Sequence, residues 1–250
     1  LITPLYETLV KKILKSEYLQ VDETRIQVLD RDKKKKTHRG WYWTYRDMES
    51  GLVFFDYHES RGREGPAGLL NDFYGYLQTD GYEVYNQFEK GQITHVLCMA
   101  HARRYFEQAL GNDQERAEYV LKEMQKLYAV ERYCRENNLS VYDRLDLRQE
   151  KSVPVLEGLH QWLKDTVVKV TPTSAIGKAI AYALPRWERL MLYAHDGRLE
   201  IDNNLVENAI RPIAIGRKNY LFAGSHEAAQ NAAMFYSLLG TCKLKGIEPF

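Results

Sequence analysis

The spacing of apolar residues predicts an amphipathic helix at the beginning of the chain, followed by a group of strands. After Thr3 and Pro4, which suit a helix start, apolar residues recur at the i, i+3, i+4 and i+7 positions of a helix, at Tyr6, Leu9, Val10 and Ile13. Three runs rich in aromatic and β-branched residues follow at 18–30, 40–47 and 52–58. Short polar turns join these runs, which predicts an antiparallel meander.

After residue 63 the pattern alternates between helix and strand. We expect helices at 66–74 and 84–88, and strands at 76–80 and 93–99. Strands that are connected through helices pair in parallel. The sequence therefore predicts an α/β fold with a mixed five-stranded sheet flanked by helices.

From residue 107 to residue 195 the strand signals disappear and helical stripes replace them. Helix starts are indicated by Ser152 with Pro154 and by Ser174, and Pro185 should kink or split the helix that contains it. We interpret 107–195 as an all-helical insertion that divides the core into 1–106 and 196–250. A last helix, lined by Ala228, Ala232, Phe235 and Leu239, should end near Gly246.

The stretch 199–224 carries the strongest candidate chemistry. Asp202 is a suitable N-cap for a short helix that runs from Asn203 towards Pro212, where helix should end. On that helix Asn203, Glu207 and Arg211 share one face, and Arg217, Lys218 and Asn219 follow. We interpret Glu207 as a metal-binding carboxylate and the basic residues as phosphate contacts. The alternative is a capped surface helix with an internal Glu-to-Arg ion pair.

Two further acids occupy strands. Asp22 lies within the first strand and Asp80 ends the fourth, and these strands can be neighbours in a mixed sheet. Two adjacent carboxylates repel each other unless a divalent cation lies between them. Oxygen ligands favour Mg²⁺ or Mn²⁺, and two such ions about 4 Å apart can activate water or a hydroxyl towards a phosphodiester. Glu23 should point to the opposite face of the strand, so we leave it out of this site.

Charge and composition limit the possible partners. With 44% hydrophobic and 28% charged residues and a net charge of +1, the chain is typical of a soluble globular protein whose nucleic-acid affinity depends on local patches. One such patch is the turn at 31–39, which carries six basic residues, Lys34 and Lys35 among them, against Asp32. The alternative for this turn is a solvated hairpin tip.

The cysteines and the hydropathy of the chain indicate the cellular compartment of the protein. The three cysteines are scattered, which favours a reducing cytosol over a disulfide framework. No apolar run approaches the roughly 18 to 20 residues of a membrane span, and no signal peptide is recognisable. The chain begins inside an expected helix, so we interpret it as a fragment of a longer protein.

A second group of candidates lies at the end of the fifth strand. His95, Cys98 and His101 have ligand-like spacing, but a tetrahedral zinc site needs four ligands, usually as two pairs. We prefer a role for His101, Arg103 and Arg104 in facing DNA; the alternative is a core cysteine beside surface basic residues. The aromatic residues of the meander are interpreted as sheet core rather than base-stacking platforms: Tyr42, Trp43, Phe54 and Phe55.

Four motifs resemble one family, the DDE transposases of the insertion-sequence-sixty-six group. They are VDET (21–24), LQTDGY (77–82), CMAHARRYF (98–106) and DGRLEIDNNLVENAIRPIAIGRKNYLFAGS (196–225). The resemblance implies a ribonuclease-H-like fold in which Asp22, Asp80 and Glu207 form the catalytic triad. It also implies a helical insertion between the second Asp and the Glu. The chain departs from many relatives at Asn208, where they have Arg, so one DNA-facing charge is missing.

The resemblance implies a function in moving an insertion sequence by metal-dependent DNA strand cleavage and strand transfer. Two Mg²⁺ or Mn²⁺ ions would be the cofactors, and transposon ends and target DNA the partners of a homo-oligomer in the bacterial cytoplasm, at the nucleoid and not at a membrane. The expected DNA contacts are Asn203, Arg211, Arg217, Lys218, Asn219, Lys34, Lys35, His101, Arg103 and Arg104. The alternatives are a hydrolysis-only nuclease of the same fold and a catalytically dead DNA-binding remnant.

Overall fold

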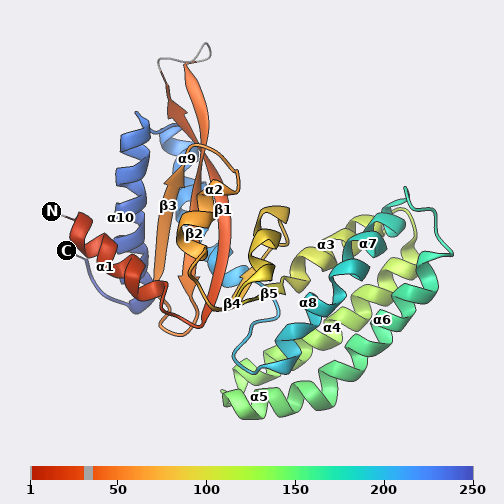
Figure 1. The fold of residues 1–250 in the computed structure, drawn as a ribbon. Coiled ribbons are helices and arrows are strands. Elements are labelled where there is room, and N and C mark those ends of the chain that lie inside the picture. Colours follow the sequence, from red (N-terminus) through yellow and green to blue (C-terminus); the bar gives the residue numbers. More distant parts are fainter. Residues whose placement is uncertain (1, 31–35, 250) are drawn as a thin grey trace. The chain divides into compact units, whose positions relative to one another are not determined.

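The computed structural model describes residues 2–30 and 36–249 (Figure 1). Its contacts divide the chain into two compact units. The sheet unit comprises Leu1–His95 and Asn203–Phe250, and the helical unit comprises Val96–Asp202. The predicted DNA contacts Lys34 and Lys35 lie outside the described residues.

The sheet has five strands in the order β3-β2-β1-β4-β5. β1 (Tyr18–Leu29) pairs antiparallel with β2 and parallel with β4, and β2 pairs antiparallel with β3. The other strands are β2 (Thr37–Asp47), β3 (Val53–His58), β4 (Gly75–Thr79) and β5 (Ile93–Leu97). The predicted α/β class with a mixed five-stranded sheet is confirmed, and this arrangement is consistent with the ribonuclease-H-like fold.

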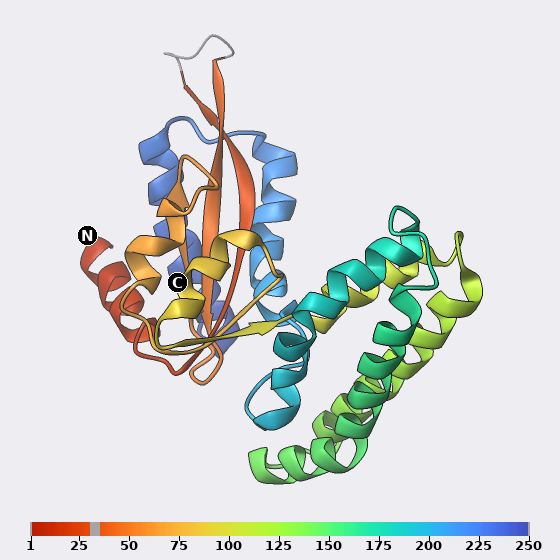
Figure 2. The ribbon, with the colours of Figure 1, turned by 45° about the vertical axis from the view of Figure 1, so that its right-hand side comes forward.

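Helices cover both faces of the sheet because successive strand side chains point to opposite sides. One face packs against α1 (Thr3–Ile13), α2 (Glu64–Leu70) and the 3₁₀ helix η1 (Glu83–Lys90) around a core that includes Leu19, Val21 and Trp43. The other face packs against α9 (Asn204–Tyr220) and α10 (His226–Lys245). Figure 2 shows α9 and α10, in blue, extending along the strands. The four aromatic residues of the meander are buried, as predicted for sheet core.

The helical unit is built from α3 (Met99–Ala109), α4 (Gln114–Glu136), α5 (Val141–Leu147), α6 (Val153–Val167), α7 (Ala175–Ala183) and α8 (Trp187–Met191), with short helices η2 (Arg148–Ser152), η3 (Leu184–Arg186) and η4 (Leu192–His195). Ser174 caps α7, since its side chain accepts from the Gly177 amide at 3.1 Å. Pro185 lies in η3, where the helix splits as expected. The predicted insertion bounds, 107–195, fall inside this unit. The division of the chain at these bounds stays a prediction.

The helix that carries Glu207 differs from the prediction at both ends. Asn203, not Asp202, is its N-cap residue, and the Asn203 side chain makes no cap hydrogen bond. The helix also continues through Pro212 to Tyr220 instead of ending there. A proline removes one helical hydrogen bond. Here Ile210 and Ile213, on either side of the proline, are buried against the sheet, and this packing keeps the backbone helical.

None of the helices in the described ranges combines the length and apolar character needed to cross a bilayer.

Candidate active site

Asp22 and Asp80 meet where the pairing of β1 with β4 ends. The last paired residues are Gln20 and Gln78, so β1 continues past the end of β4. Asp80 follows β4 directly, and its Oδ1 accepts from the Tyr82 amide at 2.8 Å. Gly81 makes this turn with φ of +91°, a conformation that favours glycine. The two acids therefore sit at the open end of the β1–β4 pair.

Glu23 joins these two acids. Carboxylate oxygens of Asp22, Glu23 and Asp80 all lie within 4.8 Å of one another. Glu23 was left out of the site as a residue of the opposite strand face, but its carboxylate belongs to the same group. Alternation does direct Asp22 and Glu23 to opposite faces of a strand, but no β4 residue pairs beside them. Carboxylates from both faces can then converge on the strand end.

Arg61 and the buried Tyr85 hold the Glu23 carboxylate. Its Oε1 accepts from Nε of Arg61 at 2.8 Å and from Nη2 of the same guanidinium, and its Oε2 accepts from the Tyr85 hydroxyl at 2.9 Å. The Glu23 side chain is 1% exposed, whereas that of Arg61 is 39% exposed. Sequence reasoning did not single out Arg61, because no spacing or motif distinguishes it from its basic neighbour Arg63.

Glu207 lies in the first turn of α9, on the sheet face opposite to Glu23. Its carboxylate does not belong to the group of oxygens within 4.8 Å, but its charge acts on Asp22. Two contacts fix the helix start to the sheet. Arg46 donates from Nη1 to the Leu205 carbonyl at 3.0 Å, and the Val206 amide donates to Oε1 of Gln20 at 3.2 Å.

A buried amide network lies beneath the acids. Gln20 donates from Nε2 to Oε1 of Gln78 at 2.8 Å, and the Tyr18 hydroxyl donates to the same oxygen. Both glutamines are 0% exposed. Burying an amide side chain without a hydrogen-bond partner is costly. The hydrogen bond between Gln20 and Gln78 therefore favours one relative position of β1 and β4. The sequence pattern offered no signal for this network apart from two polar residues in apolar strands.

Burial and mutual repulsion raise the pKa of two acids in the group. Burial raises the pKa of Asp22 well above its usual value, and the charges of Glu23, Asp80 and Glu207 raise it further. Burial and Asp80 also raise the pKa of Glu23, against the opposing effect of Arg61. An all-oxygen donor set of this kind fits a hard divalent cation such as Mg²⁺ or Mn²⁺.

The predicted DNA contacts on α9 differ in exposure. Arg211, Lys218 and Asn219 are exposed. Arg217 donates from Nη1 to Thr24 Oγ1 and to the Arg25 carbonyl, both at 2.8 Å, so it ties the last turns of α9 to β1. Asn203 is buried, and its role in DNA binding stays a prediction.

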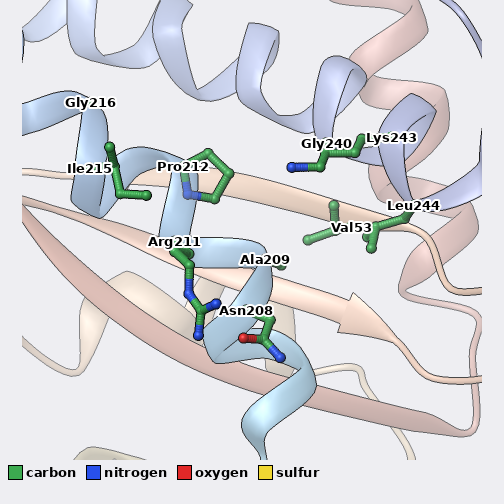
Figure 3. Close-up of a pocket in the computed structure, with 10 residues that line it drawn as sticks. All are labelled: Val53, Asn208, Ala209, Arg211, Pro212, Ile215, Gly216, Gly240, Lys243 and Leu244. Atoms are coloured by element: carbon green, nitrogen blue, oxygen red, sulfur yellow. The ribbon is translucent and has the colours of Figure 1, made fainter.

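A groove of about 600 Å³ separates α9 from α10. Figure 3 shows Asn208 and Arg211 on α9 and Lys243 on α10, with Val53 of β3 between the helices. Within the described part of the chain, its lining does not include the acids of the site. The groove is therefore a separate feature with a basic rim.

The remaining candidates are on or next to α3. Arg103 forms an ion pair with Glu107 at 2.8 Å, while Arg104 is exposed and His101 is half-buried. His95 is hydrogen-bonded to Thr79 at 2.8 Å. Among the described residues His95, Cys98 and His101 do not form a group with metal-ligand geometry. Their role in DNA binding stays a prediction.

Comparisons of the whole chain with known proteins point to the same family as its four sequence motifs. The Transposase IS66 family matches residues 1–231. The uncharacterized proteins y4hP and y4qI of Sinorhizobium fredii are each 33% identical to the chain over 98% of it, and y4jD is 31% identical over 99%. The chain covers 48% of each of the first two relatives and 51% of the third, so it spans about half their length. No solved structure matches. The chain belongs to the Transposase IS66 family.

Proposed function

We propose that this chain catalyses DNA strand cleavage and strand transfer with Asp22, Asp80 and Glu207 as its catalytic carboxylates. The observation that carries the proposal is the convergence of Asp22 and Asp80 from adjacent parallel strands, with oxygens within 4.8 Å. Glu207 supports it, because its charge acts on Asp22 from a helix that Gln20 and Arg46 hold against the sheet.

The reaction consists of two phosphoryl transfers. Water first attacks a phosphodiester at a transposon end, so that a new P–O bond forms and the 3′ oxygen leaves as a free hydroxyl. That 3′ hydroxyl then attacks a target phosphodiester, which joins the strands and releases a second hydroxyl. Two Mg²⁺ or Mn²⁺ ions, when bound, would supply activation of the attacking oxygen and stabilisation of the leaving oxygen. Asp22 and Asp80 would hold both ions, and Glu207 would hold one.

DNA would be bound by basic residues that neutralise backbone phosphates. Arg211 and Lys218 are exposed on α9, and Arg104 is exposed on α3. Such contacts are largely independent of sequence and weaken as salt rises. Transposon-end recognition and assembly into a homo-oligomer on DNA would complete this function. The protein would act in the bacterial cytoplasm, where its DNA substrate lies.

Glu207→Gln tests the assignment. The variant keeps the size and shape of the side chain but loses its charge and one acceptor oxygen. We expect DNA binding to persist while Mn²⁺-dependent cleavage of a labelled duplex falls by at least about a hundredfold, the range in which catalytic groups act. Glu227→Gln, an exposed change near the start of α10, is the matched control. Cleavage by Glu207→Gln at the wild-type rate would contradict the triad.

Two further measurements separate the alternatives. Products that join a labelled strand to target DNA distinguish a transposase from a nuclease that only hydrolyses. Mn²⁺ titration by calorimetry distinguishes both enzymes from a catalytically dead remnant. Absence of binding at millimolar Mn²⁺ would favour the remnant.

A further inference from the structure

Arg61 lies between β3 and α2 and contacts the carboxylate group through Glu23. Hydrogen bonds and aromatic contacts both hold its guanidinium. Its Nε and Nη2 both donate to a single oxygen of Glu23. The guanidinium also stacks on the Tyr82 ring at 3.9 Å and lies 5.0 Å from the centre of the Trp41 ring. Hydrogen bonds in its plane and rings against its faces fix both the position and the orientation of the group.

This arrangement leaves part of the guanidinium available. Arginine has five N–H donors, and Nη1 of Arg61 makes no hydrogen bond to any described residue. The side chain is 39% exposed although its partner Glu23 is buried. Arg61 also interacts with the charge of Asp80. A fixed, partly exposed cation with free donors therefore stands at the edge of the acidic group.

A DNA strand that approaches the carboxylate group needs a positive charge beside it. Its phosphates carry negative charge, and three converging carboxylates repel them. Arginine is well suited to phosphate oxygens, because its planar fork can donate two parallel hydrogen bonds. Glu23 is less suited than Asp22 or Asp80 to act as a metal ligand, because its Oε1 already accepts two hydrogen bonds and its Oε2 accepts one.

We propose that Arg61 binds a phosphate of the DNA strand beside the carboxylate group, and that Glu23 and Tyr82 are positioning residues for its guanidinium. The inference rests on the proposed function, because it takes DNA as the ligand. It adds a substrate contact outside the triad and outside the predicted basic residues of α9. It also gives Glu23 a role distinct from that of its neighbour Asp22.

The first test compares Arg61→Ala with Arg63→Ala, which removes the same charge from an exposed position two residues away. The probe is a fluorescein-labelled DNA duplex of arbitrary sequence, and anisotropy reports binding to the 250-residue chain in EDTA and in Ca²⁺ over a salt series. We expect Arg61→Ala to weaken binding roughly tenfold and to reduce the salt slope by about one, and Arg63→Ala to have a smaller effect. Equal effects of the two variants would overturn the inference.

The second test uses Glu23→Gln, measured in EDTA so that metal binding has no influence. General electrostatics predicts tighter DNA binding when a negative charge is removed. Positioning predicts the opposite, because a neutral amide holds the guanidinium less firmly. We expect several-fold weaker binding in Glu23→Gln and no further loss when the change is added to Arg61→Ala. Tighter binding, or additive losses, would overturn the positioning role.

The outcomes also separate this inference from the proposed function. Thermal unfolding of each variant shows whether the chain is folded, and Arg61→Lys, which keeps the charge, serves as a milder change where alanine disrupts the loop. A wild-type chain that binds no DNA would overturn both ideas. Wild-type affinity in Arg61→Ala and Arg61→Lys would overturn the inference alone.

Discussion

The backbone amide of Val206 donates to the side-chain oxygen of Gln20 at 3.2 Å, which joins the first turn of α9 to β1. Gln20 in turn donates to Gln78 of β4 at 2.8 Å. Each candidate catalytic acid is one or two residues away from a member of this network: Asp22 from Gln20, Asp80 from Gln78 and Glu207 from Val206. The relative positions of the three acids therefore depend on two buried amide side chains.

Gln20→Leu should disturb this network. The change removes the two hydrogen bonds that Gln20 makes, with the Val206 amide and with the Gln78 oxygen, so we expect a loss of about 1–3 kcal/mol in the free energy of unfolding. Strand cleavage should fall further than the loss of folded protein explains. Urea unfolding and the cleavage assay measure the two effects. Gln27→Leu, an exposed position on the same strand, is the control, and equal unfolding curves for both variants would contradict the role of Gln20.

Stability without metal should depend on pH through Asp22. Burial and the neighbouring acids raise the pKa of the folded Asp22 above its ordinary value near ~3.9. The folded state then binds a proton more tightly than the unfolded state, so this contribution is complete below the ordinary pKa. It is lost as pH rises through the raised pKa. Thermal unfolding in EDTA should show this decline in the wild type and a smaller one in Asp22→Asn; identical pH profiles would contradict it.

Divalent metal should reverse that trend. Metal competes with protons for the same carboxylates, so the stabilisation by Mn²⁺ should increase with pH over the range in which Asp22 titrates. Asp80→Asn should reduce the Mn²⁺-induced rise in melting temperature. Asp72→Asn, at an exposed acid outside the group, should leave it unchanged. A Mn²⁺ shift that is the same in both variants would place the ion elsewhere.

Substitutions of Arg217 and of Lys218 should affect different properties, the first stability and the second DNA binding. Arg217→Ala removes two hydrogen bonds to β1, at Thr24 and Arg25, and should lower the free energy of unfolding by about 1–3 kcal/mol. Lys218 is exposed, so Lys218→Ala should weaken DNA binding, reduce its salt slope by about one and leave unfolding unchanged. Anisotropy and urea unfolding report the two properties. The reverse pattern would contradict the roles assigned from the structure.

Local patterns were sufficient to predict much of the fold. Aromatic and β-branched runs predicted β1 to β3, and the alternation of helix and strand predicted that the strands of Asp22 and Asp80 could be neighbours. That neighbourhood is what brings the two carboxylates together. The split at Pro185 and the cap at Ser174 followed from backbone chemistry, which acts within a few residues.

The errors arose where distant segments decide the outcome. Pro212 was expected to end its helix, but Ile210 and Ile213 pack against the sheet and override the local preference. Glu23 was assigned by strand alternation alone, and only the register shows that β4 ends before it. Arg61 is recognisable only from its contacts with Glu23 and Tyr82, since a loop residue has no periodicity to reveal it.

The sheet unit is made from two stretches of chain with the helical unit between them. During synthesis the ribosome completes the strands that carry Asp22 and Asp80 first and must then translate residues 96–202 before α9 emerges. The nascent sheet face that α9 and α10 later cover, including buried Val28 and Phe55, remains uncovered through that interval. A pause or truncation between residues 96 and 202 would therefore leave a polypeptide that contains Asp22 and Asp80 but not yet Glu207.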